Sequence, residues 1–303
     1  MKVLAFGEVL WDFIAGDKFF GGAPVNFAAH VVQCGAEAAI ITALGTERLG
    51  DQALEEIQKA GLSAAFVQRV DAKVTGRVMV TLNNGQPSYR IKKDVAFDYI
   101  DKSRIDLNAV SAYDALYFGT LAQRNTASRE ALYHLLDNAH FRTIFYDVNL
   151  RKDGYSREIV EKSFSYCNIA KMNVEETLIL SRLLYSEELS PELFVERIMK
   201  DYSQIKIVLV TSGAKGCTVY SEGVHKTVTS DPVQLIDAVG AGDAFCAAFL
   251  TTYIKTNDAN KAARIGNMVG GFVASESGAI PQYPARFKRK VEVLSESNSI
   301  SSN

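Results

Sequence analysis

The segment DAVGAGDAF places three small residues, Gly240, Ala241 and Gly242, directly before the carboxylate of Asp243. The residues that follow are mostly small or apolar, which predicts a buried helix. A tight turn into a helix N-terminus offers unpaired backbone N–H groups and a positive dipole end to an anion. Asp243 could instead be only an N-cap, but a cap alone does not need two glycines.

A second glycine-rich turn, GGAPVN, precedes another predicted helix near the N-terminus. Asn26 lies one turn into that helix and can present a donor and an acceptor to a polyol, or it can be a capping or surface residue. Asp12 interrupts an apolar run, where a carboxylate needs a partner or a pocket unless it reaches solvent. A carboxylate accepts two hydroxyl donors, so these residues suit a sugar.

Three further segments carry polar residues that follow apolar runs. Arg151 in DVNLR could meet phosphate oxygens or a substrate hydroxyl, or form a surface salt bridge. Asn173 and Glu176 in KMNVEE share one helical face and could hold Mg²⁺ through water, although Glu176 could equally complete a cap. The segment TSGAKG (residues 211–216) suits either a nucleotide-binding turn or an ordinary strand-to-hairpin turn. The chain has no G-x-x-x-x-G-K-[ST] phosphate loop.

Short apolar runs alternate with helical patterns and supply the elements that must position these residues. Runs such as IKIVLV are apolar at consecutive positions, which is typical of parallel strands covered on both faces. The order predicts a layered α/β fold with helices on both sides of the sheet. Residues 75–99 differ, because they alternate with period two around Asn84-Gly85, a hairpin signal. Such a hairpin needs cover, so we expect a lid over the site, with a sheet-edge extension as the alternative.

Composition limits the classes of protein. The chain has 303 residues, is 48 % hydrophobic and carries a net charge of −2, so we expect one domain over residues 1–295 and a polar tail at 296–303. No basic excess supports a nucleic-acid or membrane partner. Four scattered cysteines and the absence of a bilayer-spanning run predict buried thiols and a cytoplasmic location.

The motifs, in this order, resemble the ribokinase-like (PfkB) carbohydrate kinase family over nearly the whole chain. The stretches that carry the resemblance are GGAPVNFAAHVVQCGAEAAIITALGTERLGDQALEEIQKAGL and DAVGAGDAFCAAFL. The forms GGAPVN, GEVLWD and DVNLR are most similar to bacterial fructokinases. The resemblance implies a three-layer sandwich, with a mostly parallel central sheet flanked by helices and a small β-strand lid.

The resemblance also implies transfer of the γ-phosphoryl group of ATP to a sugar hydroxymethyl group, with fructose as the favoured sugar. It makes Asp243 the catalytic base and the N–H groups of the preceding turn an anion hole. We expect the helix dipole to keep Asp243 ionised, so that it is a weak base that acts by its position. The other implied positions are Asp12, Gly22 and Asn26 for the sugar, Asn173 and Glu176 for Mg²⁺, and Thr211, Gly213, Gly216 and Asn267 for ATP.

Several expectations stay open beside this one. Phe97, in the chain returning from the lid, is our candidate for a substrate-binding residue, an apolar contact that excludes water from the transferred phosphoryl group. Two lids are expected to pack together in a homodimer. Backbone oxygens near Asp237 leave room for K⁺. The alternative functions are a 2-keto-3-deoxygluconate kinase, a nucleoside or vitamin kinase of the same fold, and a non-catalytic sugar-binding regulator.

Overall fold

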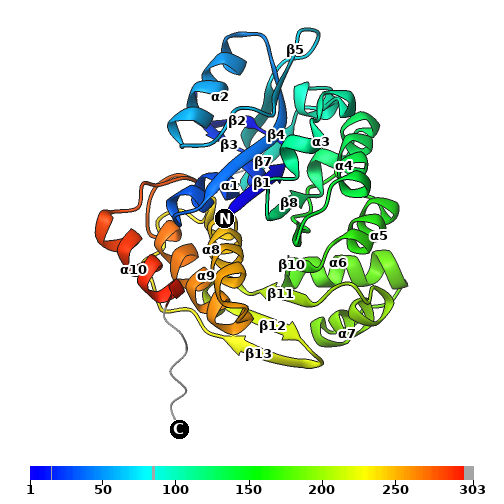
Figure 1. Ribbon diagram of the computed structural model, residues 1–303, viewed down its shortest axis with the longest axis vertical. Helices are drawn as coiled ribbons and strands as arrows, with labels where there is room; N and C mark the ends of the chain where they lie inside the picture. The colour runs from blue at the N-terminus through cyan, green and yellow to red at the C-terminus, as the bar shows by residue number, and fades with distance from the viewer. Residues whose placement is uncertain (15, 84–85, 297–303) are drawn as a thin grey trace.

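Two β-sheets organise the computed structural model, which describes residues 1–14, 16–83 and 86–296 (Figure 1). The larger sheet has the strand order β13-β12-β11-β10-β9-β8-β1-β4-β5. Strands β5 to β11 in this order pair in parallel, and β12 and β13 extend the sheet antiparallel. The bounds are β1 (Lys2–Phe6), β4 (Glu37–Gly45), β5 (Val67–Val70), β8 (Ala115–Gly119), β9 (Thr143–Asp147), β10 (Ile169–Asn173), β11 (Ile207–Thr211), β12 (Cys217–Ser221) and β13 (Val224–Val228).

Helices cover both faces of the larger sheet. The α-helices are α1 (Ala23–Gln33), α2 (Arg48–Lys59), α3 (Leu107–Val110), α4 (Thr126–Asn138), α5 (Arg157–Tyr166), α6 (Val174–Tyr185), α7 (Pro191–Asp201), α8 (Ala241–Thr256), α9 (Ala259–Ala274) and α10 (Ala285–Glu296). Short 3₁₀ turns are η1 (Ala96–Tyr99), η2 (Lys102–Arg104), η3 (Leu121–Gln123) and η4 (Gly213–Lys215).

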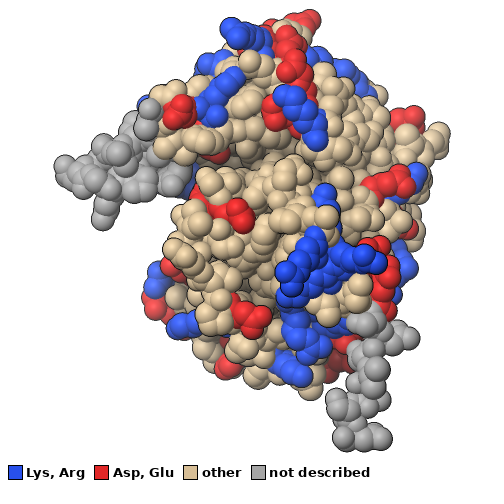
Figure 2. Space-filling model, turned by 90° about the vertical axis from the view of Figure 1, so that its left-hand side faces the viewer, with Lys and Arg blue, Asp and Glu red and all other residues tan. Residues whose placement is uncertain are grey.

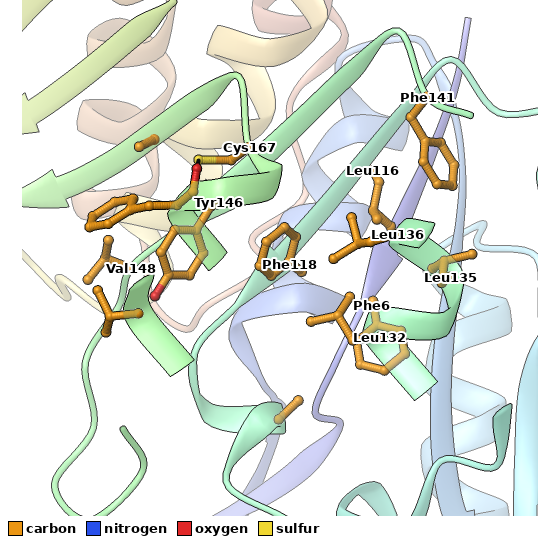
Figure 3. Packing of buried hydrophobic residues seen from close by; sticks show 14 of the residues in the cluster. Phe6, Leu116, Phe118, Leu132, Leu135, Leu136, Phe141, Tyr146, Val148 and Cys167 are labelled. Carbon is orange, nitrogen blue, oxygen red and sulfur yellow. Dashed lines mark hydrogen bonds between the residues drawn. The ribbon is translucent and has the colours of Figure 1, made fainter. Parts of the chain in front are cut away.

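The two faces of the sheet have separate hydrophobic cores, because successive side chains of a strand point to opposite faces. In β1, Leu4 and Phe6 pack with α4 to α7, whereas Val3 and Ala5 pack with α1, α2, α8 and α9. Figure 3 shows the first core, in which Phe6 and Phe118 of the sheet meet leucines of α4. The predicted three-layer α/β sandwich with a mostly parallel sheet is therefore confirmed.

A smaller four-stranded sheet, which we call the lid, has the order β3-β2-β6-β7. Its strands are β2 (Leu10–Ile14), β3 (Asp17–Gly21), β6 (Gly76–Asn83) and β7 (Gln86–Ile91). Strands β6 and β7 form the predicted hairpin up to the pair Asn83–Gln86, and the turn residues Asn84 and Gly85 lie outside the described residues. The sequence analysis did not assign β2 and β3 to the lid, although β2 lies beside β6 and gives the hairpin the neighbour it needs.

A small apolar cluster joins the base of the lid to the rest of the chain. Its members are Leu10, Val78, Val95, Phe97 and Leu121. Phe97 is fully buried there, and the guanidinium of Arg124 lies 4.7 Å from its ring centroid. Arg124 also forms two hydrogen bonds with Asp98, of 2.7 and 2.8 Å. The substrate contact that we expected of Phe97 is therefore not seen, because its ring has no exposed surface.

The molecular surface carries charges of both signs. Figure 2 shows a hollow between the upper and lower halves of one face, and Lys and Arg side chains gather lower on it. Helix α10 lies on this side in Figure 1 and exposes Arg286, Lys288, Arg289 and Lys290. This concentration is local, since the whole chain has a net charge of −2. No helix in the described part of the chain has the length and hydropathy of a membrane span.

Candidate active site

The first turns of two helices meet at the edge where the parallel strands of the large sheet end. Asn26, in the first turn of α1, donates a hydrogen bond from Nδ2 to Oδ2 of Asp243 in the first turn of α8, over 2.8 Å. Open α/β sheets bind ligands at this edge, because the polar ends of strands and the N-termini of helices face one crevice there. The two glycine-rich motifs, far apart in sequence, thus form one site.

The turn before α8 requires glycine at Gly240. This residue has a φ of 79°, and a Cβ atom built on it would lie 2.3 Å from the carbonyl oxygen of Ala279. Asp237 braces the turn, because its carboxylate accepts hydrogen bonds from the N–H groups of Val239 and Gly278. In the first turn of α8 the N–H of Ala241 donates to the carbonyl oxygen of Ala238 over 3.3 Å, whereas the N–H groups of Gly242 and Asp243 have no backbone acceptor among the described residues, so they can face an anion.

Asp243 ionises near neutral pH. Burial raises its pKa to about 7, the hydrogen bond from Asn26 opposes this rise, and the carboxylate of Asp147 adds to it. The positive charges of Lys171 and Arg151 act in the opposite direction. Our expectation that the helix dipole would keep Asp243 a weak base is wrong, because desolvation outweighs it. A carboxylate with this pKa suits proton transfer at neutral pH.

Two acceptor oxygens lie close to Gly21. A Cβ atom at this position would lie 3.3 Å from Oδ2 of Asp12 and 3.8 Å from Oδ1 of Asn26. Oδ1 of Asn26 is buried and has no hydrogen-bond partner among the described residues. Asp12 is half-buried on the lid, and burial raises its pKa. These oxygens can accept hydrogen bonds from neighbouring hydroxyl groups of a polyol.

Gly22 allows α1 to start directly against the end of β1. Its φ is 122°, and a Cβ atom there would lie 2.5 Å from the carbonyl oxygen of Glu8. Any side chain would push the first turn of α1, and with it Asn26, away from the sheet. The role of Gly22 is therefore to permit this close approach of two backbones.

Arg151 is exposed, and its positive charge interacts electrostatically with several acidic residues of the site. Its charge opposes the rise in pKa that burial causes at Glu8, Asp12 and Asp243. Within the described ranges it forms no ion pair, so the surface salt bridge that we considered is not seen there. Arg151 therefore presents its guanidinium group near the acids of the site.

Glu8 is a residue that the sequence analysis missed. Its side chain is buried at the end of β1, burial raises its pKa to about 7, and its Oε2 has no hydrogen-bond partner in the described part of the chain. The signal was present, because Glu8 interrupts the apolar run FGEVLW.

Asn173 and Glu176 form a capping box at the start of α6. Oδ1 of Asn173 accepts from the N–H of Glu176, and Oε2 of Glu176 accepts from the N–H of Asn173, both over 2.8 Å. Oε1 of Glu176 also accepts from the N–H of Leu150. The cap that we considered is thus formed. Each oxygen keeps a second lone pair, so the donor set still fits a cation that is held through water.

The turn after β11 and helix α9 meet at the end of β13. Gly213 and Gly216 have φ values of 55° and 100°, and a Cβ atom at Gly216 would lie 2.1 Å from the carbonyl oxygen of Val228. Asn267 donates from Nδ2 to the same oxygen over 2.8 Å. Thr211 ends β11, beside the antiparallel β12, so the turn also satisfies the hairpin interpretation. The four residues predicted to bind ATP, namely Thr211, Gly213, Gly216 and Asn267, therefore lie near one another.

Comparison with known proteins gives one consistent family. The family model described as pfkB family carbohydrate kinase matches residues 4–286. The Pyrococcus horikoshii sugar kinase PH1459 is 28 % identical over 297 residues and 91 % of each chain. Its crystal structure, described as that of an uncharacterized sugar kinase, has a TM-score of 0.81 and covers 97 % of this chain and 100 % of its own. Fructokinase-1 of Oryza sativa subsp. japonica is 25 % identical, over 96 % of each chain. A Xylella fastidiosa fructokinase, 21 % identical over 97 % of each chain, shares the fold with a TM-score of 0.87.

The raised pKa of Asp243 predicts a pH-dependent gain in stability for Asp243→Asn. An unfolded Asp has a pKa of about 4, so between about pH 4 and pH 7 the folded wild type binds its proton more tightly than the unfolded chain does. Wild-type stability therefore falls as pH rises through this range, whereas the amide does not titrate. Urea unfolding should show a larger advantage for the variant at pH 8 than at pH 5. An advantage that is equal at both pH values would contradict the burial of this charge.

Proposed function

The chain belongs to the pfkB family of carbohydrate kinases, and from this premise we propose that it transfers the γ-phosphoryl group of ATP to a hydroxymethyl group of fructose. The observation that carries the proposal is the hydrogen bond between Asn26 and Asp243, made where the N-terminus of α8 offers N–H groups to an anion. It puts a proton acceptor, a polyol-binding amide and an anion site within one crevice.

The proposed reaction uses each of these groups once. Asp12 and Asn26 hold hydroxyl groups of the sugar, and Asp243 accepts the proton of the attacking hydroxyl as its oxygen bonds to phosphorus. The bond from the γ-phosphorus to the leaving ADP oxygen breaks, and the N–H groups of Gly240, Ala241 and Gly242 stabilise charge on the transferred group. The pKa of Asp243, about 7, supports this role in proton transfer.

ATP is proposed to bind along Thr211, Gly213, Gly216 and Asn267, beside the first turn of α8. The Pyrococcus horikoshii sugar kinase has been crystallised in complex with ATP, which supports this nucleotide. Mg²⁺, held through water by Asn173 and Glu176, would supply neutralisation of phosphate charge. Backbone oxygens of the loop at Asp237 leave K⁺ as a further proposal. Omission of each cation from an ATP-turnover assay measures these two requirements.

Fructose is the favoured sugar because relatives along nearly the whole chain are named fructokinases. A second candidate, 2-keto-3-deoxygluconate, is favoured by one observation. Arg151 lies near Asp12 and forms no ion pair among the described residues, so it could bind the carboxylate of a sugar acid. A nucleoside or vitamin substrate has no comparable support. A non-catalytic regulator would not require the turn and Asp243 to remain complete.

We propose one kinase domain over residues 1–295, with the lid as its insertion, in the cytoplasm. All four cysteines are free and buried, as expected for a reducing compartment. In cell fractionation the protein should therefore accompany a cytosolic marker.

An ADP-release assay with Mg-ATP tests the proposed function. The acceptor substrates to compare are fructose, 2-keto-3-deoxygluconate, ribose, tagatose 6-phosphate and nucleosides. We expect the highest kcat/KM with fructose, and a loss of about 10²–10⁴-fold in kcat for Asp243→Asn with ATP and sugar still bound. Turnover of the sugar acid alone would replace fructose by the second candidate. If the variant keeps more than about a tenth of the wild-type kcat, the assignment of the base is wrong.

Asp12→Ala should act mainly on the sugar. It removes a charged acceptor, an interaction of about 1.5–3 kcal/mol, so the sugar KM should rise by roughly tenfold to hundredfold while ATP affinity stays near the wild-type value. Asn26→Ala should have a smaller effect of the same kind. Asp17→Ala is the matched control, because Asp17 is an exposed acid on the adjacent strand of the lid. An unchanged sugar KM in Asp12→Ala would make Asp12 a structural residue.

We propose a homodimer in which two lids pack together. The lid exposes Ile14, Phe19 and Met79, of which 40 %, 48 % and 49 % of the surface is accessible. By strand register Ile14 and Phe19 lie on one face of this sheet and Met79 lies on the other, and exposed apolar side chains of this size favour burial against a partner. Sedimentation at micromolar concentration should give a dimer for the wild type and a monomer for Met79→Glu. Leu193→Glu, on exposed α7, is the control and should remain dimeric. A wild-type monomer would exclude this assembly.

A further inference from the structure

A buried ion pair lies beneath the first turn of α8. Nζ of Lys171 is 3.1 Å from Oδ1 of Asp147, and the two side chains are only 9 % and 1 % exposed. They are direct partners in the register of the neighbouring strands β10 and β9. Oδ2 of Asp147 also accepts a hydrogen bond from the hydroxyl of Tyr117 over 2.9 Å. Both charges are therefore held in fixed positions, Asp147 at the end of β9 and Lys171 in the middle of β10.

The ion pair faces the turn that precedes Asp243. A Cβ atom built at Gly242 would lie 3.7 Å from Nζ of Lys171, so the ammonium group contacts the first turn of α8 where no side chain intervenes. One turn further along α8, Sγ of Cys246 lies 3.8 Å from Oδ2 of Asp147. Helix α8 therefore packs directly on the pair, and both charges act at short range on the residues of its first turn.

Stability alone does not account for a pair at this place. Removal of two charges from water costs several kcal/mol per ion, and apolar residues of similar size often serve a fold as well. The neighbouring positions on the same face of the sheet are apolar, including Ile169 of β10 and Leu209 of β11, the register partner of Lys171. A charged pair here is thus better explained by what it does to the adjacent carboxylate.

The two charges oppose each other at Asp243. The groups that act on this carboxylate are Asn26 from α1, Asp147 from β9, Lys171 from β10, Arg151 beyond β9, Tyr117 from β8 and Cys246 from α8 itself. Asp147 disfavours a second negative charge, and Lys171 favours it. Burial acts against the charge of Lys171, but Asp147 holds its pKa above the ordinary value, so the ammonium group stays charged. Loss of either partner would leave the other charge uncompensated beside Asp243.

We propose that Lys171 is a positioning residue which, by compensating Asp147 and facing the turn at Gly242, keeps the buried Asp243 able to ionise at neutral pH. The proposal rests on the proposed function, in that an ionised Asp243 matters because it accepts the proton of the sugar. The pair itself does not touch the reacting atoms. Its effect is to balance the negative charge of Asp147, at the end of β9, against the positive charge of Lys171, in the middle of β10.

Opposite substitutions should therefore move the ionisation of Asp243 in opposite directions. Lys171→Met leaves Asp147 uncompensated, so Asp243 should ionise about one pH unit higher. Asp147→Asn leaves Lys171 uncompensated, so Asp243 should ionise at least about one pH unit lower. The double variant removes both charges and should return the midpoint toward the wild-type value. A purely structural role would not produce shifts of opposite sign.

NMR titration of the full chain labelled with [¹³Cγ]aspartate measures this midpoint without turnover, nucleotide or metal. Asp243→Asn identifies the resonance by its loss. Lys171→Arg keeps the charge and should titrate like the wild type, and Lys206→Met removes an exposed charge at the start of β11 and should do the same. The expected result is an upward shift in Lys171→Met and a downward shift in Asp147→Asn.

Shifts in the same direction, or no shift in either variant, would overturn the proposal. If Lys171→Met does not fold, Asp147→Asn and the double variant decide the question, because they predict a lower midpoint and a restored one. Failure of the kinase proposal would be a separate result. It would appear as turnover retained by Asp243→Asn, whereas the titration reports only on the electrostatics of the carboxylate.

Discussion

The hydrogen bond between Asn26 and Asp243 is the contact on which the rest of the site depends. It requires α1 and α8 to start at the same point, although more than two hundred residues separate them in sequence. That meeting is possible only because Gly22 and Gly240 adopt positive φ and let each helix begin against another backbone. The sandwich supplies the remaining condition, since both helices lie on the same face of the sheet and share one core.

Burial of charge is the constraint that follows. The crevice contains the carboxylates of Asp12, Asp147 and Asp243, and each pays a desolvation penalty that only nearby positive charge or hydrogen bonds can offset. Lys171 and Arg151 supply the positive charge, one from inside the fold and one from its surface. The buried ammonium group of Lys171 has a fixed position and acts on Asp243 without a ligand, whereas the exposed side chain of Arg151 is free to turn toward a ligand. The two cations are therefore not equivalent, although each lowers the pKa of Asp243.

Local patterns in the sequence predict the large sheet and most of the motif positions. Consecutive apolar residues identify strands buried on both faces, and a glycine-rich turn before a helix identifies an anion site without knowledge of its neighbours. Long-range features could not be predicted in this way. The residues of β2 and of β6 do not by themselves indicate that these two strands pair. The burial of Phe97 depends on a cluster that also includes residues from three distant parts of the chain. The pKa of Asp243 depends on the same kind of distant packing, which is why the helix dipole alone gave the wrong direction.

Asp12 is the acidic residue through which the lid contributes to the site. Strand β2 follows β1 after only three residues, so Asp12 belongs to the lid while Asn26 and Asp243 belong to helices on the main sheet. A polyol whose hydroxyl groups donate to both Asp12 and Asn26 would connect the lid to the main sheet. The free energy of those bonds then acts on the position of the lid as well as on affinity. In the proposed complex the same contacts would exclude water from the crevice, and this exclusion would strengthen the charge interactions around Asp243.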